Sequence, residues 1–304
     1  MPCKNCLKKA VITLPNSNIK LCSNCFVKYF EKKTFKTLAK YAMIKEGDRI
    51  AVAVSGGKDS FSLLYLLNKF AEKHRKLGVV VVSIDEGIKG YRNLSNVERY
   101  CKENSIEYHA FSFKEEFGLT LDKMTKKVKM NPCSICGILR RFMLNSKARE
   151  LKLTKLATGH NLDDEAQSIL MNQFRGNLER SARLGPVTGI LSDKRFVRRI
   201  KPFYLLTEKE VATYSFLKKF PVPYNECPYS VSSYRADVRD MLNEFTKKHP
   251  QTKNAIVNSF LEVLPILKKR YSESKIKTCK VCGEPTSGDV CTVCKLLESL
   301  NVKK

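Results

Sequence analysis

Short apolar runs alternate along the middle of the chain with segments whose apolar residues recur at helical spacing. Strands are predicted for the runs at 49–54, 79–84, 107–113, 155–158 and 196–200. Helices are predicted at 61–67, 97–103, 135–151, 162–174 and 208–220, the last with Thr207 as its N-cap. Strands that alternate with helices indicate an α/β fold, with a mainly parallel sheet covered on both faces.

The two ends of the chain depart from this alternation. C-x-x-C pairs lie near both termini, and the segments 26–43 and 238–271 have the pattern of basic helices. We therefore expect three parts: a small N-terminal metal unit at 1–30, a large α/β domain at 31–271 and a small C-terminal metal unit at 272–304.

The 304 residues are 43% hydrophobic, which is enough apolar material for a folded core. No stretch approaches the roughly 20 uncharged apolar residues that span a bilayer, and the first residues lack an apolar signal region. The expectation is a soluble cytoplasmic protein without a membrane partner. In that compartment, twelve cysteines favour metal binding over disulfides.

The charge is strongly positive, because 56 Lys and Arg residues face 30 Asp and Glu residues, a formal balance of +26. A polyanionic partner is the favoured interpretation, and nucleic acid ranks above a membrane because no basic amphipathic anchor stands out. The alternative is that the lysines only solvate the surface.

Eight cysteines form two complete sets of four, each made of two C-x-x-C pairs. They are Cys3, Cys6, Cys22 and Cys25 near one end, and Cys279, Cys282, Cys291 and Cys294 near the other. Fifteen and eight residues separate the two pairs of each set. Both sets predict closed, tetrahedral, structural zinc sites, which makes two Zn²⁺ per chain. Cys101 is left over in a helical segment, and we assign it to packing.

Three further cysteines have no fourth partner. Cys133 and Cys136 form a C-x-x-C pair at the start of a predicted helix, and Cys227 stands far away, before Pro228. Such a pair with a distant Cys-Pro favours ligation of an iron–sulfur cluster with one open corner. Two alternatives stay open: a catalytic persulfide and disulfide pair of Cys136 with Cys227, or three buried small hydrophobic residues.

A loop suited to phosphate lies between the first strand and its helix. It reads Ser55, Gly56, Gly57, Lys58, Asp59 and Ser60. Glycines let the backbone approach an anion, the helix start supplies free N–H groups, and the serines and Lys58 add donors. The pattern is not that of a Walker loop. The alternative is a tight turn without a ligand.

The carboxyl ends of two other strands carry further candidates. Ser83 and Ile84 end the second strand, while Gly159 and His160 follow the fourth. Ligands of open parallel sheets lie at such ends, so these residues are candidates for nucleotide contacts. Asp164 opens the next helix, where a carboxylate also serves as a cap. His160 alone is as consistent with a packed structural histidine.

The loop 55–60 is the signature of PP-loop ATP pyrophosphatases. Five features occur in order: the loop, the Cys133–Arg141 element C-x-x-C-G-x-x-x-R, the stretch 158–166 (TGHNLDDEA), Cys227 and the terminal cysteine units. Together they resemble the TtuA/NcsA family of tRNA 2-thiouridine synthetases along nearly the whole chain. The resemblance implies a Rossmann-like PP-loop domain. It also implies that ATP with Mg²⁺ adenylates O2 of a tRNA uridine.

The resemblance also implies residue roles. Cys133, Cys136 and Cys227 would hold a [4Fe-4S] cluster whose fourth iron carries the hydrosulfide that attacks C2 of the uridine. Arg140 stands where relatives of the TtuA type usually carry a catalytic lysine, so we expect it to stabilise the α-phosphate electrostatically. Asp164 is the candidate for Mg²⁺ or proton handling. The nucleotide would lie against the loop, against the residues that precede it, Ala53 and Val54, and against Ser83, Ile84, Gly159 and His160.

Members of this family act on U34 or on U54. The all-cysteine N-terminal set and Arg140 favour U34. The sulfur donor is either sulfide or a ubiquitin-like thiocarboxylate carrier, and the family implies a homodimer. Three alternatives remain at this point: an RNA-binding module with a vestigial loop, cytidine thiolation or lysidine formation by a related PP-loop enzyme, and thiolation by a persulfide without a cluster.

Overall fold

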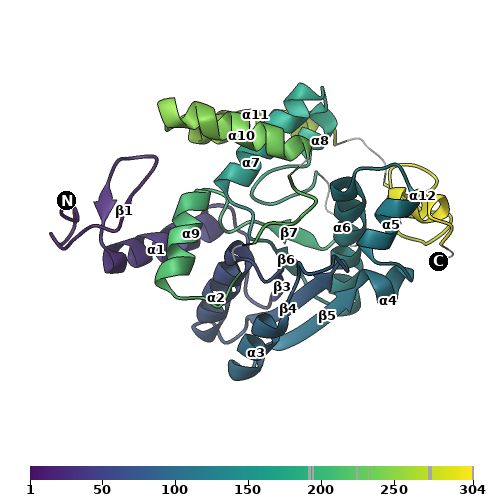
Figure 1. Ribbon diagram of the computed structural model, residues 1–304, viewed down its shortest axis with the longest axis horizontal. Coiled ribbons are helices and arrows are strands. Elements are labelled where there is room, and N and C mark those ends of the chain that lie inside the picture. Colours follow the sequence, from purple (N-terminus) through teal and green to yellow (C-terminus); the bar gives the residue numbers. More distant parts are fainter. Residues whose placement is uncertain (191–192, 194, 224, 232, 273–275, 303–304) are drawn as a thin grey trace.

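A computed structural model describes residues 1–302 apart from 191–192, 194, 224, 232 and 273–275. Its centre is a five-stranded, fully parallel sheet with the strand order β5-β4-β3-β6-β7 (Figure 1). The strands are β3 (Arg49–Ala53), β4 (Gly78–Asp85), β5 (Glu107–Ser112), β6 (Lys155–Ala157) and β7 (Arg198–Ile200). The predicted α/β class and parallel sheet are confirmed.

Helices cover both faces of the sheet. On one side lie α1 (Ser23–Lys40), α2 (Lys58–Glu72), α3 (Ser95–Glu103) and α9 (Glu208–Leu217). On the other lie α4 (Phe113–Phe117), α5 (Leu121–Lys127), α6 (Pro132–Glu150) and α12 (Thr292–Ser299). A third group, with its own apolar core, comprises α7 (Leu162–Phe174), α8 (Leu178–Ala182), α10 (Tyr234–Lys248) and α11 (Thr252–Arg270).

The side chains of the central strands explain the two covered faces. Ile50 and Val52 of β3 pack into the core beneath α1, α2 and α9, while Ala51 between them belongs to the core beneath α6. Successive residues of a strand point to opposite faces. A strand that is apolar at every position is therefore buried on both sides, as parallel sheets require.

Small two-stranded sheets belong to the two ends of the chain. β1 (Ile12–Thr13) pairs with β2 (Lys20–Leu21), and β8 (Lys277–Thr278) pairs with β9 (Pro285–Thr286). In Figure 1 the two termini lie at opposite ends of the molecule. Helix α1 runs without a break through the expected boundary at residue 30, and the division into three parts stays a prediction.

The predicted elements differ from the structure mainly at their ends. The basic segment 238–271 is two helices, because the chain leaves the helical conformation between Lys248 and Thr252, around Pro250. Proline disfavours helix in the residue before it and lacks an N–H donor. The short helices α4, α5 and α8, with five to seven residues each, were not predicted. Among the described residues, no helix is long and apolar enough to cross a membrane.

The strand order places two loops together. From β3 the chain proceeds outward to β4 and β5, then returns to pair β6 with the other side of β3. The order of connection therefore reverses between β3 and β6, and the loops that follow these strands meet at the carboxyl edge of the sheet. In open α/β sheets this position is where ligands bind.

Candidate active site and metal centres

The loop between β3 and α2 is closed by its own hydroxyl groups. Ser60 Oγ accepts from the backbone N–H of Ser55 at 3.1 Å and donates to the carbonyl of Gly57 at 3.1 Å. Gly56 has φ +82, a conformation that residues with a side chain rarely adopt. Beneath the loop, the buried Ser83 donates its hydroxyl to the carbonyl of Val54 at 2.8 Å. The turn is thus preformed at the start of α2.

The loop after β6 approaches this turn closely. A Cβ atom at Gly159 would lie 2.8 Å from the carbonyl carbon of Asp59, so a side chain has no room there. Asn161 Nδ2 donates to Asp59 Oδ1 at 3.3 Å, and the Asn161 side chain also caps α7. Gly159 therefore allows the two loops to form one surface at the carboxyl edge.

Lys58 is held by two carboxylates. Its Nζ lies 2.9 Å from Asp59 Oδ2 and 3.1 Å from Glu208 Oε1, at the start of α9. Burial alone would lower the pKa of Lys58, but the charges of Asp59 and Glu208 outweigh burial and raise it. Lys58 is therefore a fixed cation at the loop.

A buried ion pair connects the loop with the helix of the cysteine pair. Arg92 donates from Nε to Glu86 Oε2 at 2.6 Å and from Nη2 to Oε1 at 2.8 Å, and its Nη1 contacts the carbonyl of Ser55. Arg140 on α6 donates to Glu86 Oε1 at 3.3 Å. The Glu86 side chain is only 1% exposed. Its carboxylate thus joins the loop, through Arg92, to Arg140.

The structure brings the three unpaired cysteines together. Cys133 and Cys136 lie in the first turns of α6, which starts with Pro132 after the N-cap Asn131. Cys133 Sγ lies 3.3 Å from the carbonyl oxygen of Tyr229, two residues after Cys227. Burial, the larger cause, and the nearby Cys227 both raise the pKa of Cys133. The trio therefore assembles from two distant segments at the carboxyl edge of the sheet.

The surroundings of the trio fit an anionic metal cluster better than a single ion. Among the described residues, only the two terminal sets bring their ligand atoms within 4.8 Å of one another, so the trio is spaced more widely. Burial raises the pKa of Cys136 to about 11, while Arg140 and Arg92 oppose that rise. Cationic neighbours favour thiolates and would balance the negative charge of a cubane cluster.

Asp164 faces the loop from the start of α7. Its carboxylate accepts from the backbone N–H of Asn161 at 3.1 Å and lies 3.7 Å from Arg235 Nη1. Burial raises the pKa of Asp164 to about 6, against the opposing effects of Arg235 and the Asn161 N–H. Asp59, Asp164 and Arg235 line a hollow of about 160 Å³. A carboxyl group that titrates near neutrality in a hollow is suited to metal binding or proton handling.

Two other candidates lie inside the protein, whereas His160 is exposed. Val54 and Ile84 are almost fully buried. His160 Nδ1 lies 2.9 Å from the hydroxyl of Thr158. Contacts of these residues, and of Ala53, with a nucleotide stay predictions.

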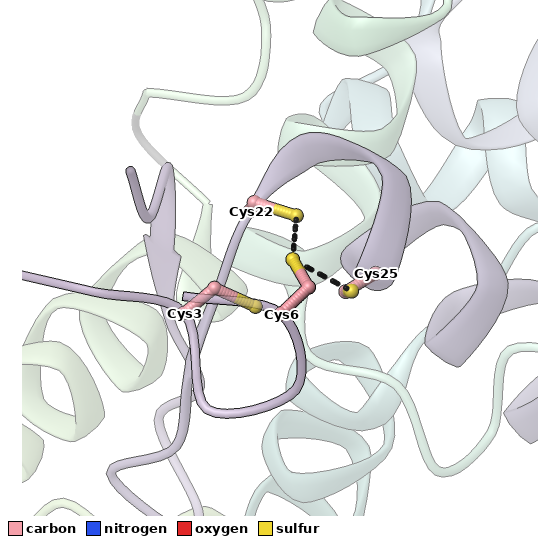
Figure 2. Close-up of side chains that lie close together, drawn as sticks. All are labelled: Cys3, Cys6, Cys22 and Cys25. Carbon is pink, nitrogen blue, oxygen red and sulfur yellow. Dashed lines mark hydrogen bonds between the residues drawn. The ribbon is translucent and has the colours of Figure 1, made fainter. Parts of the chain in front are cut away.

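Both terminal sets have the geometry of a closed zinc site. In Figure 2 the sulfur atoms of Cys3, Cys6, Cys22 and Cys25 converge, with 3.4 Å between the Cys6 and Cys22 sulfurs. In the other set, 3.8 Å separates Cys279 Sγ from Cys294 Sγ. Zn–S bonds of about 2.3 Å place tetrahedral sulfurs about 3.8 Å apart. The described residues thus fit zinc at both ends of the chain.

Sequence reasoning missed Glu86, Arg92, Glu208 and Arg235. Glu86 directly follows Asp85, the last residue of β4. Its position just after the predicted nucleotide contacts Ser83 and Ile84 was a signal that could have identified it. Arg92 and Glu208 lie in segments without a motif. Only the folded structure brings them to the loop.

The fold and the loop define a PP-loop protein, and the family described as "PP-loop domain" matches residues 28–244. The chain is 34% identical to tRNA-5-methyluridine(54) 2-sulfurtransferase of Pyrococcus horikoshii, covering 100% of this chain and 96% of the relative. It is 33% identical to tRNA 2-thiolation protein NcsA of Haloferax volcanii, covering 99% of each chain.

A solved structure agrees with these relatives. The U34-tRNA thiolase NcsA from Methanococcus maripaludis with its [4Fe-4S] cluster superimposes with a TM-score of 0.86 at 34% identity, covering 100% of this chain and 98% of that one. The chain therefore belongs to the TtuA/NcsA-type tRNA 2-thiolation proteins of the PP-loop ATP pyrophosphatase superfamily, and the predicted family is confirmed.

Proposed function

We propose that this protein is an ATP-dependent tRNA-uridine 2-sulfurtransferase. O2 of the target uridine attacks the α-phosphate of ATP, pyrophosphate leaves, and a sulfur nucleophile then displaces AMP at C2. The observation that carries the proposal is the connection of Arg140 through Glu86 and Arg92 to the nucleotide loop. It links the part of the chain suited to ATP with the part suited to sulfur delivery.

The loop residues supply the contacts for ATP. The proposed donors to the phosphates are the N–H groups at the start of α2, the hydroxyls of Ser55 and Ser60 and the ammonium group of Lys58. Asp164 handles Mg²⁺ or a proton, because its carboxyl group lies in the hollow beside Asp59. Arg140 is permanently charged and stabilises the α-phosphate as negative charge develops there.

Cys133, Cys136 and Cys227 are the proposed ligands of a [4Fe-4S] cluster. When bound, the cluster would supply an iron with an open position for the sulfur that is transferred. The name of the solved relative from Methanococcus maripaludis includes such a cluster. The partly buried thiols of Cys136 and Cys227 pack against the apolar core beneath the sheet, which limits the access of water to this site.

The proposed target is the wobble uridine U34. The relatives named for U54 and for U34 are both 34% identical to this chain, so similarity alone does not choose between them. Arg140 and the all-cysteine set Cys3, Cys6, Cys22 and Cys25 carry the preference for U34. Modification at U54 by the same chemistry is the alternative that a position-specific assay decides.

The remaining partners follow from this reaction. We propose tRNA and ATP as substrates, sulfide or a ubiquitin-like thiocarboxylate carrier as the sulfur donor, two structural Zn²⁺ per chain, and a homodimer. A relative from Caenorhabditis briggsae is named cytoplasmic tRNA 2-thiolation protein 1 and is 35% identical over 99% of this chain. It supports a cytoplasmic location.

The test is an anaerobic reaction of reconstituted protein with ATP, sulfide and tRNA transcripts. Mass spectrometry of nucleosides should detect 2-thiouridine, and pyrophosphate should form in equal amount. Transcripts in which U34 or U54 is replaced by cytidine identify the target. Full sulfur transfer by iron-free protein would favour the persulfide route, and a thiocytidine product would contradict the proposal.

A further inference from the structure

An exposed stack of a cation on an aromatic ring lies beside the candidate active site. The guanidinium carbon of Arg175, which follows α7, lies 4.0 Å from the ring centroid of Tyr234 at the start of α10. Tyr234 is 36% exposed, and the neighbouring Phe174 is 56% exposed. An exposed cation–π pair adds only about 0.5–1 kcal/mol of stability, which is a small structural gain. A flat, cationic, solvent-exposed surface of this kind is therefore better explained by a ligand that stacks on it.

The residue after Tyr234 connects this stack to the active site. Arg235 donates to Gln167 Oε1 at 3.1 Å and to Ser168 Oγ at 3.0 Å, and it forms the ion pair with Asp164. The charge of Arg235 also acts on the Cys133 thiol. The stack is therefore adjacent in sequence to Arg235, whose side chain pairs with Asp164 and acts on the cysteine trio.

Two arginines with no ion pair among the described residues add charge here. The guanidinium group of Arg141 folds over Gly137, so that a Cβ atom there would lie 3.3 Å from both Nη atoms. Glycine within a helix costs about 1 kcal/mol relative to alanine, and Gly137 provides the room for Arg141. Arg180 on α8 lies near enough for its charge to act on Arg141, while the adjacent Glu179 pairs with Arg183.

We propose that the Arg175–Tyr234 stack, together with Arg141 and Arg180, binds the unpaired RNA nucleotides that flank the target uridine. This inference rests on the proposed function and names the surface where that substrate docks. Single-stranded bases stack on tyrosine rings and guanidinium planes, and their phosphates pair with arginines. A carboxylate tail of a carrier protein would satisfy the cations but would gain nothing from the flat surface.

The experiment measures tRNA binding and steady-state thiolation with full-length, reconstituted protein. Tyr234→Ala should raise the Kd and KM for tRNA about 5- to 150-fold, the range for the loss of one stacked base. Tyr234→Phe keeps the ring and should stay within about twofold of wild type. Arg141→Gln should weaken binding at low salt and reduce the salt slope by about one. The Kd for ATP should not change.

Phe216→Ala is the matched control, since Phe216 is an exposed aromatic residue, 74% accessible, near the far end of α9. The inference would be overturned if wild-type protein thiolates tRNA and the Tyr234→Ala variant has the same Kd and KM for tRNA. It would also be overturned if Phe216→Ala weakened tRNA binding as much as Tyr234→Ala does. If Tyr234→Ala unfolds, Arg175→Ala gives the same comparison. A defect limited to turnover with a carrier protein would instead assign the surface to that protein. Failure of the proposed function is distinct, because wild-type protein would then form no 2-thiouridine.

Discussion

The closed cysteine sets at the two ends of the chain contrast with the open trio in its centre. Each closed set gathers four sulfur atoms within 4.8 Å from one short stretch of sequence. The trio combines Cys133 and Cys136 at the start of α6 with Cys227, and it is spaced more widely. In the proposed roles, the same side chain serves structural and reactive metal chemistry, and the number and spacing of its partners distinguish the two.

The neighbours of the sulfur atoms differ as well. In the C-terminal set, backbone groups support the sulfurs, such as the Cys291 N–H that lies 3.3 Å from Cys279 Sγ. Around the trio, the neighbours include arginine side chains, which carry charge and can contact a substrate, besides the backbone carbonyl of Tyr229. A structural metal site needs only sulfur ligands that are supported by hydrogen bonds. A reactive metal site also needs charged side chains beside an open coordination position.

The strongest test of this contrast removes one ligand of the trio. We expect Cys227→Ser to lose its iron and to thiolate tRNA only at background level, because two thiolates do not retain the cluster. Zinc should remain at two per chain. Metal analysis and nucleoside mass spectrometry measure both outcomes. Activity that survives the loss of iron would mean that the trio acts as thiols.

The reciprocal variant is Cys6→Ser in the N-terminal set. It should lose one zinc and keep the iron. The melting temperature should fall by about 5–10 °C. This corresponds to a stability loss of about 2.5 kcal/mol, at about 2–4 °C per kcal/mol for large domains. Calorimetry with metal analysis tests this expectation. Loss of iron in this variant would show that the two kinds of site are not independent.

The next test concerns the connection between the nucleotide loop and the trio. Glu86→Gln leaves Arg92 buried without its charge partner, and we expect a loss of about 3 kcal/mol of stability together with weaker ATP binding. Adding Arg92→Gln should recover part of the stability. Denaturant unfolding of both single variants and the double variant measures the coupling free energy. If the stability losses of the two single variants simply added in the double variant, Glu86 and Arg92 would not be coupled.

Arg140 offers a graded test of charge. Arg140→Ala should slow pyrophosphate release at saturating ATP about 100-fold, as for the loss of a preorganised donor. Arg140→Lys retains the cation and should lie within about tenfold of wild type. Iron content, measured in parallel, should be normal in both. Equal loss in the two variants would point to a role of the guanidinium geometry rather than of charge.

The smallest change concerns protonation of Asp164. In protein without nucleotide or Mg²⁺, its carboxyl group should titrate near pH 6 by carbon-13 NMR, because burial raises its pKa. The carboxylate form, which binds a cation, is therefore populated above pH 6 and lost below it. Arg235→Gln removes an opposing cation and should move the midpoint upward. A midpoint near 4 would contradict the buried environment of Asp164.

Contiguous signals made much of the fold and site predictable. The loop 55–60 and the cysteine sets are defined by spacing within short segments, and β3 and β4 are apolar at nearly every position. Helices α4, α5 and α8 escaped, because their five to seven residues are shorter than the window in which helical periodicity becomes visible. Pro250 offered a signal for the break between α10 and α11 that was not used.

The side chains that connect the motifs were not predictable. Arg92 reaches Ser55 because β3 and β4 are neighbours in the sheet, and Glu208 reaches Lys58 across 150 residues of sequence. No fixed sequence spacing relates either Arg92 or Glu208 to its partner in the loop, because tertiary structure brings them together. Sequence patterns identify reactive groups that lie close together along the chain. They do not identify the partners that orient those groups.

The C-terminal cysteine unit shares its apolar core with the helix that begins at the proposed iron–sulfur ligands. Cys279, Cys291 and Cys294 are buried together with Leu139 and Met143 of α6, and Arg149 of α6 contacts Glu284. Loss of the proposed zinc would weaken the support of α6. A cell short of zinc would then make under-thiolated tRNA even with abundant iron, so the supply of one nutrient metal would govern the use of another.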